Sequence, residues 1–391
     1  MLESWRWFGP QDPVTLSDAR QAGAQGVVTA LHHIYDGRIW TPDDITERKA
    51  LVAKAGMTWS VCESIPVNSA IKRRDGEWRR YLDAWKQSLA NLGKGGVPVI
   101  CYNFMPVVDW TRTNLMYPTE AGGFALRFDM IDFVAYDVFV LKRRAAEDSY
   151  APDVIEAATQ RLTGMREDEI LTLEKNIIAG LPGGEDSHTR EKIRAEIASF
   201  DAVSSDDMRA NLIEFLKEVV PVAGENGVRL AIHPDDPPFS LFGLPRVVST
   251  AEDVQTILDA VNEPANGITL CAGSYSSCTG NDVVAMAKRF ADRIHFAHLR
   301  NVSKEPDGSF IESEHLAGDV NMVSLISALR AEERRREKEG RSDTVIPMRP
   351  DHGHLLIDDQ KKTVNPGYSC IGRLKGLAEL RGVIAAVDQL T

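Results

Sequence analysis

The segment 349–354, Arg-Pro-Asp-His-Gly-His, brings a carboxylate and two imidazoles together beside a glycine. It follows the apolar run 345–348, so we expect it to lie where a strand gives way to a loop. Carboxylate and imidazole groups can bind metals or transfer protons. The sequence therefore predicts one wall of an active site at this segment.

Three earlier β-prone runs also end in a side chain that can bind a metal. The runs 229–232, 267–270 and 293–297 lead into His233, Cys271 and His298, and the run before residue 349 leads to Asp351. Taken singly, such a histidine is more typical of a hydrogen-bonded structural residue, and such a cysteine of a small buried apolar one. Four equivalent positions together favour a metal site. The ligand types disfavour magnesium and calcium and leave manganese, iron(II), cobalt and zinc open.

Other polar residues at the ends of predicted strands are candidates for substrate contacts. His32 and His33 follow the run 26–31, and we name His33 as the candidate, although strand alternation alone does not decide between the two. Glu63 and Asn103 could bind substrate hydroxyls or cap their own loops. Two arginines next to predicted ligands, Arg300 and Arg349, could pair with a substrate carboxylate or form salt bridges around the rim.

Two residues are candidates for proton transfer. His352 is the neighbour of Asp351 and would stand beside a metal-bound substrate, where a general acid or base is needed. Tyr368 ends the turn 365–368, which could bring a phenol to the same mouth, although a tyrosine there, taken alone, is more typical of a core residue.

The segments that carry these residues alternate between strand and helix patterns. Eight β-prone runs, each followed by helical sequence, predict a (β/α)8 TIM barrel formed by a single domain, residues 1–391. The alternation stops at residues 107–206, which predict a mainly helical insertion after strand 4, with a glycine- and acid-rich break at 181–187. We expect this insertion to be a lid or an oligomer contact. A doubly wound sheet is the alternative, but no GxGxxG follows the first or second strand.

The composition of the chain limits which binding partners and which cellular compartment we expect. The 391-residue chain has a net charge of −12 and a pI near 5.3, which argues against nucleic acid and anionic membranes. An anionic substrate would need a local cation. The five cysteines are widely spaced without a CxxC pair, as expected in a reducing compartment. There is no signal-peptide pattern and no apolar run approaching the length of a membrane span, so we expect a cytoplasmic protein.

Four motifs resemble those of the mannonate dehydratase family of hexuronate catabolism: residues 5–10, 26–33, 102–110 and 349–354. The similarity extends from Trp5 to the C-terminal helix. The resemblance implies a xylose-isomerase-like TIM barrel, a requirement for manganese (Mn2+) or iron (Fe2+), and the dehydration of D-mannonate to 2-keto-3-deoxy-D-gluconate. It also implies metal ligation by His233, Cys271, His298 and Asp351, with proton transfer by His352 and Tyr368.

Three alternative functions are compatible with parts of this pattern. A metal-dependent sugar isomerase on the same barrel would use a more carboxylate-rich metal set, and a dehydratase of a related sugar acid would use the same site. A non-catalytic sugar-acid or metal-binding protein would bind without turnover. The insertion and the aromatic run 124–139 also lead us to expect a homo-oligomer, a dimer or higher.

Overall fold

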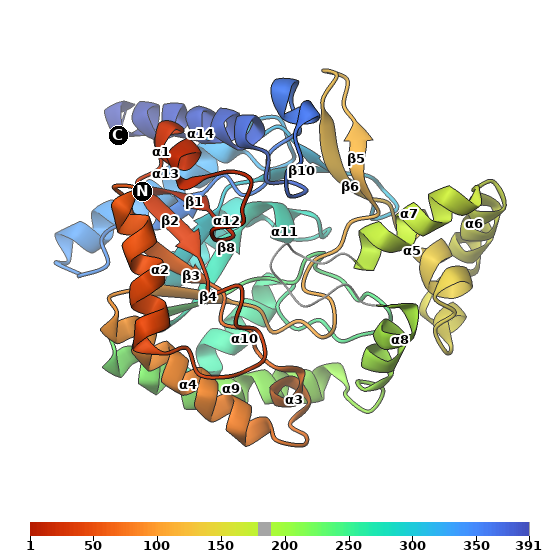
Figure 1. Ribbon diagram of the computed structural model, residues 1–391, viewed down its shortest axis with the longest axis horizontal. Coiled ribbons are helices and arrows are strands. Elements are labelled where there is room, and N and C mark those ends of the chain that lie inside the picture. Colours follow the sequence, from red (N-terminus) through yellow and green to blue (C-terminus); the bar gives the residue numbers. More distant parts are fainter. Residues whose placement is uncertain (179–188, 391) are drawn as a thin grey trace.

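The computed structural model describes residues 1–178 and 189–390. Eight parallel strands close into a barrel in the order β1-β12-β9-β8-β7-β4-β3-β2 (Figure 1). The strands are β1 (Leu2–Arg6), β2 (Gly26–Thr29), β3 (Thr58–Glu63), β4 (Val99–Tyr102), β7 (Arg229–Ile232), β8 (Asn266–Cys271), β9 (Ile294–His298) and β12 (Pro347–Arg349). The predicted (β/α)8 barrel is confirmed.

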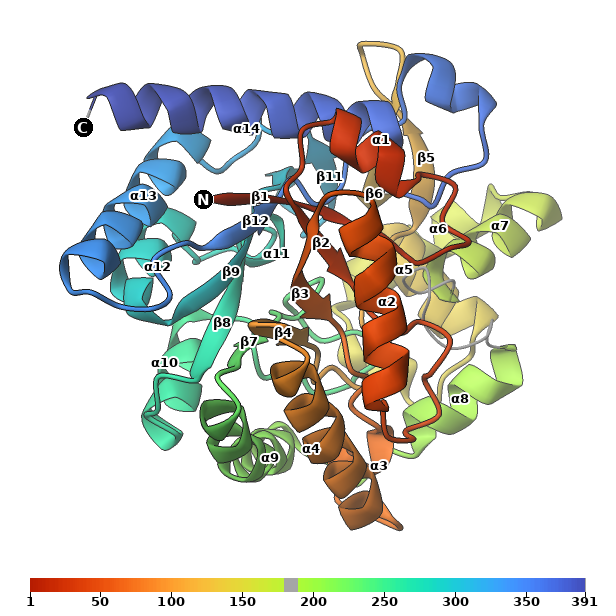
Figure 2. The same ribbon diagram turned by 60° about the vertical axis from the view of Figure 1, so that its left-hand side comes forward.

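Helices surround this barrel (Figure 2). The main ones are α1 (Leu16–Gln21), α2 (Pro42–Lys54), α4 (Trp78–Lys94), α9 (Ser205–Glu225), α10 (Ala251–Ala260), α12 (Val283–Arg289), α13 (Met322–Lys338) and α14 (Cys370–Leu390). Several begin at a capping box, as α2 does at Thr41 and Asp44, which satisfies free backbone N–H groups of the first turn. Short helices α3 (Ser69–Arg73) and α11 (Ala272–Ser276) and the 3-10 turns η3 (Ala291–Arg293) and η4 (Ile357–Lys361) lie in the connections.

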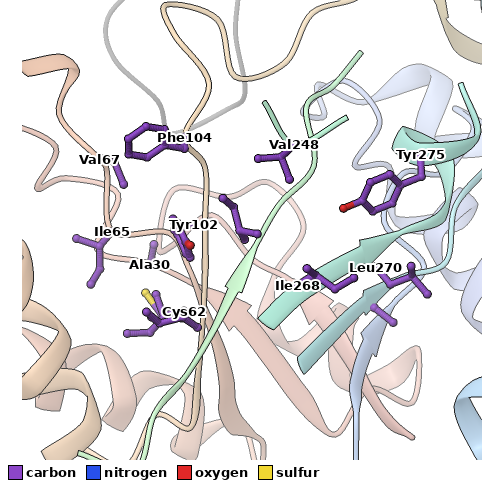
Figure 3. Packing of buried hydrophobic residues seen from close by; sticks show 14 of the residues in the cluster. Ala30, Cys62, Ile65, Val67, Tyr102, Phe104, Val248, Ile268, Leu270 and Tyr275 are labelled. Carbon is purple, nitrogen blue, oxygen red and sulfur yellow. The ribbon is translucent and has the colours of Figure 1, made fainter. Parts of the chain in front are cut away.

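Side-chain alternation along the strands divides the core into two parts. One cluster joins residues of five barrel strands: Val28, Val61, Val99, Cys101, Ala231 and Phe296. Their strand neighbours Cys62, Ile100 and Leu230 belong instead to the larger cluster, which also contains helix residues such as Leu89 and Phe215. Figure 3 shows part of this larger cluster around Cys62, Tyr102 and Ile268. The smaller cluster therefore fills the barrel, and the larger one packs the barrel against its helices.

The insertion between β4 and α9 is not helical throughout its described part. It begins with a hairpin, β5 (Asn114–Pro118) and β6 (Phe124–Phe128), and continues with α5 (Met130–Ala135), η1 (Tyr136–Val140), η2 (Ala146–Ser149), α6 (Pro152–Thr163), α7 (Glu167–Ile178) and α8 (Arg190–Ala198). Figure 1 shows α5, α6 and α7 to one side of the barrel. The break expected at 181–187 lies outside the described residues.

A second sheet joins the insertion to a later part of the chain. Strand β6 pairs with β11 (Phe310–Ser313), which pairs with β10 (Asn301–Lys304), and the sheet order is β10-β11-β6-β5. This sheet was not predicted from the sequence, because β10 and β11 lie in the connection between β9 and α13, for which the alternation of strands and helices predicted no strand. Phe128 of β6 stacks on Phe310 of β11, with ring centroids 5.6 Å apart.

The aromatic run 124–139 is largely buried within the chain. Phe128, Phe133 and Tyr136 are all buried. Phe133 packs against Phe242, which lies in the connection after β7, with ring centroids 4.8 Å apart. These rings stabilise the insertion and do not form an exposed contact surface, so they no longer support the expected oligomer. No described helix is long and apolar enough to cross a membrane.

Candidate active site

The inward-facing positions of the strands place the candidate ligands at one mouth of the barrel. Ala231 and Phe296 lie in the inner cluster, and His233 and His298 come two residues later on the same side of their strands. Thr269 also faces inward, because its hydroxyl lies 3.2 Å from the Cys101 thiol, and Cys271 follows it by two residues. The C-terminal ends of β7, β8 and β9 therefore direct these side chains toward a common centre.

The four candidate ligands lie close together. Nε2 of His233 is 3.1 Å from Nδ1 of His298, and Oδ2 of Asp351 is 3.8 Å from that same Nδ1. The Cys271 thiol lies 3.9 Å from Oδ2 of Asp351. Ligand atoms of His233, Cys271 and His298 all lie within 4.8 Å of one another. This donor set and spacing fit a divalent first-row metal.

A second group of possible ligands, Glu63, Cys101 and His298, is less suitable for a metal. Burial raises the pKa of the Cys101 thiol well above its usual value, and the side chain belongs to the apolar interior of the barrel. A metal ligand must be a thiolate, which this position disfavours.

Asp351 is held by two buried arginines. Nε of Arg300 donates to its Oδ2 at 2.8 Å, and Nη1 of Arg349 donates to its Oδ1. Burial alone would raise the pKa of Asp351, but Arg349, with His352, His298 and Arg300, holds it well below its usual value. The carboxylate is therefore ionised, as a metal ligand must be. Its backbone has φ +66°, an uncommon conformation for a residue with a side chain and one that occurs at functional sites.

Hydrogen bonds link the two histidine ligands to each other and to Arg349. Nε of Arg349 can only donate, so Nε2 of His298, 3.1 Å away, accepts. Burial, with Arg349, lowers the pKa of His298 well below its usual value, so the ring is neutral; its Nδ1 faces His233 and Asp351, and a proton there would have to leave for this nitrogen to bind a metal.

Protonation of His233 is subject to opposing effects. Burial alone would lower its pKa, but Cys271 and Glu63 raise it to about 8. A metal at Nε2 of His233 therefore competes with a proton for the same lone pair.

The two candidates for proton transfer pack against each other. The rings of His352 and Tyr368 are edge to face, with centroids 5.0 Å apart, and both residues are buried. Nε2 of His352 lies 3.6 Å from Oδ1 of Asp351. Burial raises the pKa of Tyr368 to about 12, so its phenol keeps its proton at neutral pH.

A buried network of charges surrounds these groups, and sequence reasoning missed most of it. Arg300 contacts Asp236 at 2.5 Å and Glu312 at 3.2 Å. Arg112, from the insertion, contacts the same two carboxylates at 2.9 and 2.7 Å. Glu312 in turn accepts from His352. The only sequence signal was the Asp-Asp pair at 235–236 soon after His233; nothing marked Arg112 or Glu312.

A cavity of about 580 Å³ lies next to the candidate ligands. Glu63, Asn103 and His32 line it, whereas His33 is exposed and lines only a neighbouring recess. This placement favours His32 over His33 as the residue that faces the cavity. The amide of Asn103 donates to Asp109, another lining residue, at 3.3 Å.

Glu63 joins this cavity to the ligand group. Its Oε1 accepts from Nη2 of Arg349 at 2.9 Å, and its Oε2 pairs with Arg6 at 2.7 Å. Burial alone would raise the pKa of Glu63, but Arg349 and Arg6 lower it, so the carboxylate is ionised. Arg349 thus connects Glu63 of the cavity lining to the candidate ligands Asp351 and His298. Arg300 and Arg349 both form salt bridges, as the alternative reading expected, and these salt bridges are buried.

The fold and this site define a class: a TIM-barrel enzyme with a strand-end group of residues able to hold a metal ion. The chain matches the family model described as D-mannonate dehydratase (UxuA) over residues 1–391. It is 60% identical over 389 residues to mannonate dehydratase 2 of Agrobacterium fabrum, covering 100% of this chain and 98% of that one.

Solved structures agree with this match. The mannonate dehydratase of Streptococcus suis serotype 2 is 34% identical, with a TM-score of 0.78 over 100% of this chain and 95% of that one. A xylose isomerase domain protein from Planctomyces limnophilus, 11% identical, shares the fold with a TM-score of 0.52 over 99% of this chain and 97% of that one. The chain belongs to the D-mannonate dehydratase family. The expected hydro-lyase class and reaction, dehydration of D-mannonate, are thereby confirmed.

Proposed function

We propose that His233, Cys271, His298 and Asp351 hold a divalent metal, manganese or iron(II), and that D-mannonate loses water beside it. The convergence of these four side chains at one mouth of the barrel, in a chain of this family, carries the proposal. The mixed donor set of two imidazoles, one thiolate and one carboxylate disfavours magnesium and calcium. When bound, the metal would offset the negative charge that develops as the substrate loses its C2 proton.

Two side chains each carry out one proton transfer. His352 accepts the C2 proton, and the electron pair of the C2–H bond forms a C2–C3 double bond as the C3–O bond breaks. Tyr368 protonates the departing 3-hydroxyl, which leaves as water. Its raised pKa supports this role, because the phenol is a proton donor at neutral pH. The resulting enol gains a proton at C3 and becomes 2-keto-3-deoxy-D-gluconate.

Groups beside the candidate ligands and in the cavity lining bind the rest of the substrate. Arg300 and Arg349 orient the sugar-acid carboxylate, and Glu63 and Asn103 bind hydroxyl groups. The substrate contact that the sequence analysis assigned to His33 is now assigned to His32, because His32 lines the cavity with Glu63 and Asn103. These contacts would give an acidic protein the local positive charge that an anionic substrate needs.

The described part of the insertion, 107–178 and 189–206, forms a lid on the single domain 1–391. Support comes from the cavity lining, which combines Ile193 of α8 and Phe200 after it with Glu63 and Asn103 from the barrel. An anionic intermediate needs protection from bulk water, and a covering segment supplies it. A homo-oligomer and a cytoplasmic location stay predictions.

Turnover of D-mannonate in D2O tests the reaction and its alternatives. The dehydratase yields a 2-keto-3-deoxy acid that is lighter by one water and carries deuterium from solvent at C3. A sugar isomerase would give a product of unchanged composition, and a binding protein would give none. Either of those results, in metal-loaded protein, would overturn the proposal. Conversion of other sugar acids at higher kcat/KM would reassign the substrate.

A further inference from the structure

Glu312 of β11 makes a close contact with the proposed base. Its Oε2 lies 2.7 Å and its Oε1 2.9 Å from Nδ1 of His352. Both residues are buried, so water does not compete for this hydrogen bond. An ionised carboxylate can only accept, so Nδ1 of His352 must carry a proton.

This contact determines which nitrogen of His352 is free for chemistry. With Nδ1–H bound to Glu312, Nε2 holds the lone pair of the neutral ring. Nε2 is also the nitrogen that faces Asp351, at 3.6 Å from its Oδ1. A carboxylate behind a histidine fixes the ring orientation and tautomer and stabilises the imidazolium that forms when the ring takes a proton.

Glu312 is itself held in place by two buried guanidinium groups. Arg112 donates to its Oε1 from Nε at 3.1 Å and from Nη2 at 2.7 Å, and Arg300 donates from Nη1 at 3.2 Å. Arg112 is anchored in turn to Asp236 at 2.9 Å. Arg112 belongs to the insertion, Glu312 to the segment after β9, and His352 to the loop after β12. The second sheet, in which β6 pairs with β11, brings these segments together.

We propose that Glu312 is a positioning residue for His352, and that Arg112 of the insertion holds Glu312 for this task. The inference rests on the proposed role of His352 as the base. It gives the insertion a part in catalysis beyond covering the cavity, since its Arg112 completes the support of the base.

A neighbouring pair of a glutamate and a histidine provides a matched control. His354 lies two residues after His352, and Glu314 lies two residues after Glu312, with Oε1 of Glu314 3.7 Å from Nδ1 of His354. Glu314 also pairs with Lys375 and is partly exposed. Substitution of Glu314 therefore removes a comparable carboxylate from a neighbouring histidine outside the proposed machinery.

The test compares Glu312→Gln and Glu314→Gln in metal-loaded enzyme acting on D-mannonate. We expect Glu312→Gln to lower kcat by about 10- to 100-fold, the usual effect of removing a partner behind a functional histidine. KM should stay within about twofold, bound metal should be unchanged, and Glu314→Gln should turn over like the wild type. A kcat for Glu312→Gln within about twofold of the wild type would overturn the proposal, as would equal losses in both variants.

A double substitution separates positioning from a general structural role. In a His352→Asn background, Glu312→Gln should cause no further loss, because Glu312 acts only through His352. A further loss equal to that of Glu312→Gln alone would overturn the proposal. Full turnover by His352→Asn would show that the base is assigned wrongly, and the positioning role would fall with it. A lower kcat in His352→Asn together with an unchanged kcat in Glu312→Gln would overturn only the positioning role of Glu312.

A spectroscopic measurement covers the case in which Glu312→Gln does not fold. The 15N spectra of histidine-labelled wild type and His352→Asn, both loaded with diamagnetic zinc, identify the signals of His352. The proposal predicts a proton on Nδ1 of His352. A neutral ring protonated only at Nε2 would overturn it.

Discussion

The thiol of Cys271 and Oδ2 of Asp351 lie 3.9 Å apart, although β9 separates their strands in the barrel. With β9 between them supplying His298, three adjacent walls of the mouth each present one ligand. This relationship is what the proposed metal site depends on.

Replacement of Cys271 by serine should sharply weaken metal retention. A hydroxyl is a poor substitute for a thiolate with first-row divalent metals, and loss of one ligand in four leaves an incomplete site. Metal content after gel filtration measures the effect. Cys278→Ser is the control, since Cys278 is a partly exposed cysteine beyond α11, away from the four ligands. Unchanged metal content in Cys271→Ser would remove Cys271 from the ligand set.

Metal affinity should rise with pH up to about 8 and then level off. The pKa of His233 is raised to about 8, so below that pH a proton occupies the lone pair that the metal needs. Cys271 must also bind as a thiolate, which adds to the same trend. Competition against a chelator, corrected for the chelator's own protonation, measures it in stripped protein. Equal affinity at pH 6.5 and pH 8 would contradict the assignment of His233.

The barrel and the ligands could be predicted from the sequence for the same physical reason. Strand alternation fixes which side chains enter the barrel, and the C-terminal ends of parallel strands meet at one mouth. His233, Cys271 and His298 each directly follow or end a short strand, so local sequence was enough to bring them together. The choice between His32 and His33 could not be made from the sequence, because alternation places one of the two inward without saying which, whereas the structure places His32 in the cavity lining.

The supporting network depends on long-range pairing and could not be predicted. Arg112 and Glu312 are separated by 200 residues. They meet only because β6 of the insertion pairs with β11, and β11 lies in a segment where the helix–strand alternation predicted no strand. No local pattern indicates such a pairing, so the contact between Glu312 and His352 could be identified only from the structure.

Tyr368→Phe should lower kcat by about 10²- to 10⁴-fold, because it removes the proton donor for the departing hydroxyl. The ring remains, so its packing against His352 and Phe8 should persist, and metal content and Tm should change little. Tyr102→Phe is the matched control: this tyrosine is also buried, and its hydroxyl has no hydrogen-bond partner in the described structure. Wild-type turnover in Tyr368→Phe would show that the acid lies elsewhere.

His32→Ala should raise KM for D-mannonate, whereas His33→Ala should leave it unchanged. The reason is that His32 lines the cavity with Glu63 and Asn103, while the side chain of His33 is exposed. Steady-state kinetics on the two variants decides the question. A raised KM in His33→Ala alone would restore the assignment made from sequence.

Arg112→Met should destabilise the fold by about 3–5 kcal/mol, because it leaves the buried charges of Asp236 and Glu312 short of a partner. Urea unfolding measures the change. Arg166→Met is the control, since Arg166 pairs with Asp168 on the exposed surface, and such changes usually stay within about 0.5 kcal/mol. An equally small effect of Arg112→Met would show that the network adds little to stability.

The most direct test of the central claim is metal add-back to chelator-stripped protein, with D-mannonate as substrate and formation of 2-keto-3-deoxy-D-gluconate as the readout. Manganese, iron(II), zinc and magnesium are added separately, with iron(II) handled without air. The account predicts that manganese or iron(II) restores turnover, and that His352→Ala binds the metal fully but remains inactive. Full activity in the stripped enzyme, or in metal-loaded His352→Ala, would contradict it.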